Sequence, residues 1–281
     1  MTIRTTTATA TATASGDPIL FERHGPIALL TLNREATHNA LSGDDMFSAF
    51  ETLFAQLNAD MSIRAAVLTG KGKSFCSGGN VADMRNRAGM FEGTAEEITE
   101  RYRLGIQRIP RAFAALQVPI IAAVNGAAIG AGNDLATMCD IRIASSTAKF
   151  AESFVKVGIV PGDGGCWLLP RVVGASKAAE LALTGDAIDA AEALRIGLVS
   201  QVVAPEALLD AALAMAGRIA ANPPQVLRWT KQLLRSAQTQ TLDQALGDAG
   251  RFQGLAHHTA DHAEALAAMA QKRTPRFSHG G

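Results

Sequence analysis

The stretch PIIAAVNGAAIGAGND, residues 119–134, combines an apolar run with a segment of small residues that ends in a carboxylate. Residues 119–124 are apolar and of strand length, which predicts a buried strand. The segment that follows is dominated by glycine and alanine, and such residues permit backbone to approach backbone, or a ligand, closely. Asp134 ends this segment, so an acid is expected beside that close approach.

The same order of strand, loop and helix recurs through the first half of the chain. Apolar runs at 27–32, 64–70, 119–124 and 140–145 predict strands with loops and helices between them. This alternation indicates an α/β fold with a mostly parallel sheet. From Trp167 onward the pattern is largely helical, interrupted by a short strand at 198–203. The expected helices are 176–184, 189–196, 205–221, 224–237, 241–255 and 259–270.

Composition excludes several classes of function. The 281 residues carry 26 basic and 26 acidic side chains, so no net charge favours nucleic acid, and no apolar run is long enough for a membrane span. The three cysteines show no CxxC spacing, which predicts a cytoplasmic location without a disulfide framework. His258 and His262 have zinc-like i, i+4 spacing but no evident third ligand, so no metal is expected.

Three glycine-rich loops are candidates for ligand binding, namely 74–80 (SFCSGGN), 125–134 and 158–165 (GIVPGDGG). None matches a phosphate-binding loop, a dinucleotide fingerprint or a hydrolase nucleophile elbow. One interpretation is tight packing alone. The other is that two backbone N–H groups converge on a ligand oxygen, an arrangement that stabilises a developing oxyanion.

Taken together, five segments resemble the enoyl-CoA hydratase/isomerase (crotonase) family. They are LNREATHNALS (32–42), GKSFCSGGNVADM (72–84), residues 119–145, AKFAESFVKVGIVPGDGGCWLLPRVVG (148–174) and LTGDAIDAAEALRIGLVSQVV (183–203). The low-complexity Thr/Ala composition of residues 1–16 predicts a disordered tail, with a transit peptide as the alternative. The resemblance implies a spiral of ββα units (17–205) and a helical trimerisation region (206–273). It also implies an acyl-CoA substrate, no further cofactor, and a homotrimer or homohexamer.

The resemblance implies that two backbone N–H groups, those of Ser77 and Ala131, hold the thioester oxygen. The turn NREATHNAL (33–41) is implied to contact coenzyme A, with Arg34 and His38 where relatives carry a lysine near Ala36. The residues implied to contact the substrate are Arg34, Ala36, His38, Ser77, Gly78, Gly79, Asn80 and Phe154.

Two acids are candidates for proton transfer. Asp134 falls where a typical hydratase of the family has its first glutamate, whereas the second position is Phe154, which has no proton to transfer. Asp163 is the second candidate, because some relatives that shift double bonds use an Asp one residue earlier, at Gly162. The alternatives are that Asp134 is a solvated helix residue and that Asp163 caps the following helix.

We therefore expect an enzyme acting on an enoyl-CoA thioester, with Asp134 as acid/base and an enolate held by the two amides. A single carboxylate serves a 1,3-proton shift at least as well as it serves water addition, which benefits from two acid/base groups. The alternatives are a catalytically degenerate acyl-CoA-binding or assembly subunit, and a thioesterase or decarboxylase on the same scaffold.

Overall fold

A computed structural model describes residues 16–278 of the chain. Its larger sheet has six strands in the order β1-β2-β3-β5-β7-β10. The first pair is antiparallel and the other strands run parallel to one another. The strands are β1 Ile19–His24, β2 Ile27–Leu32, β3 Ala65–Gly70, β5 Ile120–Val124, β7 Ile141–Ser145 and β10 Gln201–Val203.

A smaller sheet of four short strands lies beside the first, in the order β4-β6-β8-β9. Its strands are β4 Ser74–Cys76, β6 Ala127–Ile129, β8 Lys149–Ala151 and β9 Ala187–Asp189. Three successive long strands, β3, β5 and β7, each continue into one short strand of this second sheet. The chain thus winds through repeated units of two strands followed by helix, which confirms the predicted α/β spiral.

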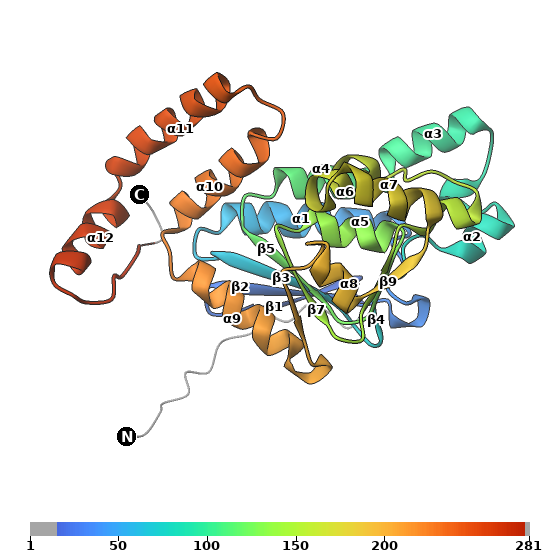
Figure 1. The fold of residues 1–281 in the computed structure, drawn as a ribbon, viewed down its shortest axis with the longest axis horizontal. Coiled ribbons are helices and arrows are strands. Elements are labelled where there is room, and N and C mark those ends of the chain that lie inside the picture. Colours follow the sequence, from blue (N-terminus) through green and yellow to red (C-terminus); the bar gives the residue numbers. More distant parts are fainter. Residues whose placement is uncertain (1–15, 279–281) are drawn as a thin grey trace.

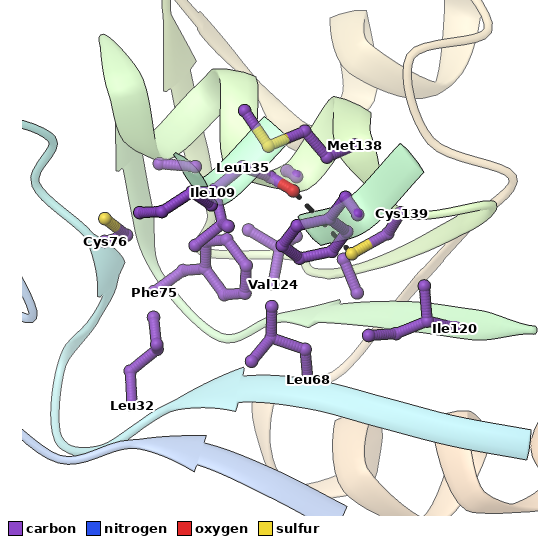
Figure 2. Close-up of a cluster of buried hydrophobic side chains, with 14 of the residues drawn as sticks. Leu32, Leu68, Phe75, Cys76, Ile109, Ile120, Val124, Leu135, Met138 and Cys139 are labelled. Carbon is purple, nitrogen blue, oxygen red and sulfur yellow. Dashed lines mark hydrogen bonds between the residues drawn. The ribbon is translucent and has the colours of Figure 1, made fainter. Parts of the chain in front are cut away.

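Helices cover both faces of the larger sheet (Figure 1). On one face lie α1 Asp44–Ala59, α4 Arg108–Ala115, α5 Ala131–Met138, α6 Gly165–Val173 and α7 Ala175–Thr184. They enclose the main core, in which Phe75, Ile109 and Leu135 meet the strand residues Leu68 and Val124 (Figure 2). On the other face, α9 Leu208–Ala220 packs alanines and leucine on β2, β3, β5 and β7.

Shorter elements connect these layers. They are the helices α2 Val81–Asn86, α3 Ala95–Leu104 and α8 Ala190–Arg195, and the 3-10 turns η1 Glu35–Thr37, η2 Gly89–Phe91, η3 Ser153–Val157 and η4 Pro205–Ala207. Within residues 16–278, no helix has the length and apolarity needed to cross a membrane.

The last three helices extend away from the sheets (Figure 1). They are α10 Pro224–Ser236, α11 Leu242–His257 and α12 Ala260–Ala270. Because α9 covers the sheet, the predicted helical region from residue 206 divides into one core helix and three projecting ones. In the predicted tail, residues 1–15 lie outside the described part of the chain.

Candidate active site

The start of α5 lies directly against the loop that follows β4. A methyl group on Gly132 would collide with the carbonyl oxygen of Cys76, and one on Gly78 would lie 3.1 Å from the Ala131 nitrogen. Gly78 also has φ +84°, a conformation that favours glycine. The small residues at 125–132 therefore allow two backbone segments to approach closely. This close packing is the first of the two interpretations of the glycine-rich loops.

The three backbone amides of the β4 loop differ in their hydrogen bonding. The Ser77 N–H donates to the His38 carbonyl oxygen at 3.0 Å, and the Gly78 N–H donates to Cys76 Sγ at 3.4 Å. Gly79 follows, and among residues 16–278 its N–H has no acceptor. The Ser77 amide, predicted to face the thioester oxygen, is thus occupied, because the 33–41 turn places a carbonyl against it.

Ala131 is the first residue of α5, and it is buried. The first N–H groups of a helix lack partners within the helix and carry the positive end of its dipole. Gly130 precedes it with φ +53°, so the chain turns sharply into the helix. The Ala131 N–H is therefore suited to bind an oxygen that carries negative charge.

One helical turn beyond Ala131, three carboxyl groups come together. Asp134 comes from α5, Glu152 follows β8, and Asp163 precedes α6; they are 0%, 1% and 2% exposed. A methyl group on Gly165 would collide with Glu152 Oε1 and with both Asp134 carboxyl oxygens, so these two side chains pack on its bare Cα. The structure thus unites both predicted acids and adds a third.

The electrostatics of this cluster follow from its burial. Burial, with the neighbouring carboxyls of Asp163 and Glu152, holds the pKa of Asp134 well above its ordinary range. Burial likewise raises the pKa of Glu152 to about 7 and raises the pKa of Asp163. Within residues 16–278, no lysine, arginine or histidine forms an ion pair with these three groups. The cluster therefore retains protons near neutral pH.

The alternative roles expected for the two predicted acids do not apply. Asp134 is fully buried, so it is not a solvated helix residue. The N-cap of α6 is Gly164, and no side-chain hydrogen bond caps this helix. The Tyr102 ring lies over the turn at Asp163, since a methyl group on Gly162 would fall 2.6 Å from its Cε1 atom. Burial and the Asp163 carboxyl raise the pKa of Tyr102.

The residues predicted to contact coenzyme A lie on the turn around η1. Ala36 and His38 are exposed, while the half-buried Arg34 forms an ion pair with Asp45. Arg34 also lines a cleft of about 720 Å³ whose apolar wall includes Phe47 and Phe91. The Phe91 ring also lies near the β4 loop, since a Cβ on Gly79 would lie 3.8 Å from its Cζ atom.

Comparison with known proteins decides the family. The family model for enoyl-CoA hydratase/isomerase matches residues 22–280. The chain belongs to the enoyl-CoA hydratase/isomerase family. It is 38% identical to a crotonyl-CoA hydratase of Syntrophomonas wolfei over 92% of this chain and 97% of that protein. It is also 38% identical to a 1,2-epoxyphenylacetyl-CoA isomerase of Escherichia coli, over 90% and 95% of the two chains.

The fold agrees with solved structures of the family. The crystal structure of an enoyl-CoA hydratase from Bacillus anthracis superposes with a TM-score of 0.87 at 31% identity, covering 93% of this chain and 99% of that one. Membership establishes an acyl-CoA enzyme of the hydratase/isomerase type.

Phe154 and Asn80, two further residues predicted to contact the substrate, belong to different elements. Phe154 in η3 packs its ring on the bare Cα of Gly130, where an added Cβ would lie 3.7 Å from the ring. Asn80 caps α2, its Oδ1 accepting a hydrogen bond from the Ala82 N–H at 3.0 Å. Phe154 therefore forms a wall beside the start of α5, in place of the second glutamate implied by the family.

Glu152 was missed by sequence reasoning. It lies two residues before Phe154, and Asn133 Nδ2 donates a hydrogen bond to its Oε2 at 2.9 Å. Its neighbours Phe150 and Ala151 are buried, so an acid in the stretch FAESF (150–154) interrupts an otherwise apolar strand end. That interruption was the available signal, because buried acids need a partner or a function.

Proposed function

We propose that this enzyme adds water to a 2-enoyl-CoA thioester. The observation that carries this proposal is the cluster of Asp134, Glu152 and Asp163, buried together one helical turn from the Ala131 amide. Hydration uses one group that accepts a proton and one that donates a proton. A cluster in which neighbouring carboxyls share protons supplies both, so the absence of an acid at Phe154 does not leave Asp134 alone.

The oxyanion hole in this proposal consists of the Ala131 and Gly79 N–H groups. Both lie where the β4 loop meets α5, and the Gly79 amide has no acceptor within residues 16–278. When water attacks Cβ, negative charge moves to the thioester oxygen as the enolate forms. Two amides aimed at this oxygen stabilise that charge, and loss of one donor typically costs about 3 kcal/mol.

Proton transfer then follows from the carboxyls. The water oxygen forms a bond to Cβ, and its departing proton passes to an ionised carboxylate of the cluster. A protonated carboxyl, for which Asp134 is the candidate, gives its proton to Cα as the enolate collapses. Water has been added across the double bond, and the number of protons on the cluster is unchanged. Each positioned acid or base typically contributes about 10²–10⁴-fold in rate.

The substrate is proposed to lie along the cleft that begins at the η1 turn. Arg34, Ala36 and His38 would contact coenzyme A, and Ser77 to Asn80 would line the thioester. The acyl chain would extend toward Phe47 and Phe91, which form the apolar wall of the cleft. Coenzyme A enters as part of the substrate, and the proposal requires no further cofactor.

A double-bond shift is the second candidate reaction. Phe154 favours it, because a single acid/base group suffices to move a proton between two carbons. The similarity to the 1,2-epoxyphenylacetyl-CoA isomerase also favours it. In this reaction one carboxylate would remove the Cα proton of a 3-enoyl-CoA and return it at Cγ, with the same two amides on the enolate oxygen.

We also propose a homotrimer or homohexamer located in the cytoplasm. The projecting helices α10 to α12 leave large apolar side chains exposed, namely Leu234, Leu242, Leu246, Leu255, Leu266 and Met269. Such a row of exposed apolar residues on a monomer is typical of a surface that a partner covers. Light scattering of the purified protein would measure the assembly.

Turnover assays test the reaction directly. Crotonyl-CoA and 3-hexenoyl-CoA would each be incubated with wild type and Asp134→Asn, and products separated by chromatography. We expect 3-hydroxybutyryl-CoA from wild type and a loss of at least about 100-fold in the variant. Formation of 2-hexenoyl-CoA without hydration would support the second candidate. Release of free coenzyme A, or acyl-CoA binding without any turnover, would refute both.

A further inference from the structure

We infer that Glu152, anchored by Asn133, is a positioning residue that places the shared proton of the acid cluster on Asp134. This assigns a role to a side chain two residues before the position where the family resemblance implies a glutamate. The inference rests on the proposed function, since it specifies how the proton donor of that reaction is kept loaded.

The backbone brings Glu152 into the cluster from a different direction than the other acids. β8 ends at Ala151, and Glu152 follows with its side chain turned inward to 1% exposure. It meets Asn133 on α5 through the 2.9 Å hydrogen bond from Nδ2 to Oε2. Its other oxygen, Oε1, packs with the Asp134 carboxyl on the Cα of Gly165.

The shortage of hydrogen-bond donors around these carboxyl oxygens indicates that at least one of the three acids is protonated. Ionised carboxylates only accept hydrogen bonds. Among residues 16–278, no neighbour donates to either carboxyl oxygen of Asp134 or Asp163, or to Glu152 Oε1. An unpartnered buried carboxylate is costly, whereas a protonated Asp134 can donate to a neighbouring carboxylate. At least one proton therefore belongs to the group.

Asn133 determines which of the three carries that proton. An amide N–H bonded to Glu152 Oε2 stabilises the ionised form of Glu152, while Asp134 receives no such donor. Asp134 interacts with both of the other carboxyls, which together disfavour its ionisation. The proton is accordingly placed on Asp134, one turn from the Ala131 amide, where the substrate Cα would lie.

The other titratable groups around the cluster do not reverse this assignment. Tyr102 from α3 and Cys76 from β4 both face Asp163, and its carboxyl raises the pKa of each. Both are therefore neutral at physiological pH and supply no positive charge. The charge that acts on Asp134 comes from Glu152 and Asp163.

The test replaces Glu152 with its neutral isostere and follows the pH dependence of hydration. If Asp134 must hold a proton, kcat/KM falls at high pH as that proton is lost. Glu152→Gln removes one negative charge beside Asp134, so the alkaline limb should move to lower pH by about one unit or more. Glu152→Asp keeps the charge, and its limb should lie closer to that of wild type. Glu206→Gln, an exposed acid in η4, should leave the limb unchanged.

An infrared titration provides a readout that does not depend on turnover. Difference spectra would follow the protonated-carboxyl band of Asp134, identified by its loss in Asp134→Asn. We expect this band in wild type to persist well above the pH at which an ordinary aspartate ionises. In Glu152→Gln it should disappear at a lower pH than in wild type. This result would stand even for a protein without enoyl-CoA turnover, so the two proposals fail separately.

Two outcomes would overturn the inference. One is an alkaline limb and an Asp134 band that titrate identically in wild type and Glu152→Gln. The other is that Asp134 in wild type ionises at a lower pH than Glu152, because the proton is then not placed on Asp134. This measurement uses wild type alone, so it applies even if the Glu152 variant does not fold.

Discussion

The Ser77 N–H donates a 3.0 Å hydrogen bond to the carbonyl oxygen of His38. This bond joins the turn predicted to contact coenzyme A to the loop that lies against α5. His38 and Asn39 both have positive φ, 53° and 60°, so two consecutive left-handed residues aim the His38 carbonyl at Ser77. The turn at residues 33–41 and the β4 loop therefore form one structural unit.

Asn39 is the residue that holds this unit, and its replacement should be destabilising. Its side chain is fully buried, donates to the carbonyl oxygens of Lys71 and Ser74 at 3.0 and 2.8 Å, and accepts from the Arg34 N–H at 3.0 Å. Asn39→Ala loses three hydrogen bonds and places alanine in a left-handed conformation. We expect about 2–4 kcal/mol less free energy of unfolding, measured by urea denaturation.

The exposed Asn86 at the end of α2 provides the control for this substitution. Asn86→Ala should change stability by less than about 0.5 kcal/mol. Equal stability of the two variants would show that the Asn39 bonds contribute nothing to the turn.

Four of the five strands of five or six residues were predicted from the sequence, whereas β1 Ile19–His24 and the four strands of the smaller sheet were not. Runs at 27–32, 64–70, 119–124 and 140–145 match β2, β3, β5 and β7 within a residue at either end, because buried parallel strands are continuously apolar. The strands β4, β6, β8 and β9 have three residues each, too few to show a pattern. Their pairing depends on contacts between distant segments.

The site was likewise predictable only where local motifs determine it, and not where distant segments come together. Asp134, Asp163 and the Ala131 helix start follow from local motifs, and the structure brings them together. Which amide of the β4 loop is free depends on where the His38 carbonyl lies, and that is set by a turn some 40 residues earlier. Glu152 joins the site only because β8 ends beside α5, a relationship that no local pattern contains.

A proline at Ala131 should remove the proposed oxyanion donor while keeping the helix. Proline is tolerated at the first position of a helix, because the N–H of that residue has no partner within the helix. Ala131→Pro removes that N–H and places its ring at the proposed oxyanion position. We expect kcat/KM to fall by about 10²–10³-fold in the crotonyl-CoA assay.

Ala95 begins α3 in the same way and is exposed, so Ala95→Pro is the matched control. It should keep activity within about twofold of wild type, since it removes an equivalent N–H away from the site. Full activity of Ala131→Pro, with its helical circular dichroism retained, would exclude the Ala131 amide from the mechanism.

Gly165 should tolerate no side chain. A methyl group there would collide with Glu152 Oε1 and the Asp134 carboxyl, so Gly165→Ala must displace two buried acids. We expect at least about a tenfold loss of kcat together with lower thermal stability, because overpacking of a filled site typically costs about 1–3 kcal/mol. Gly217→Ala in α9 meets open space and should be neutral or stabilising through its higher helix propensity. If both variants behave alike, the carboxyls do not pack on Gly165.

The acid cluster should make the protein less stable as pH rises. The pKa of Glu152 is raised from its ordinary value of 4.5 to about 7 in the folded protein. A folded state that binds the proton more tightly than the unfolded state gains stability at low pH, and this gain is lost as pH rises from about 4.5 through about 7.

The variant Glu152→Gln tests this linkage, because glutamine has no such proton to lose. The free energy of unfolding of each protein would be measured by urea denaturation at one fixed subunit concentration. The difference between the variant and wild type should shift in favour of the variant by about 1–3 kcal/mol between pH 5 and pH 8. Glu206 is exposed to solvent, so the free energy of unfolding of Glu206→Gln should differ from that of wild type by the same amount over this pH range. A constant offset for Glu152→Gln as well would mean that Glu152 ionises in the folded protein as it does in the unfolded chain, and that its burial carries no electrostatic cost.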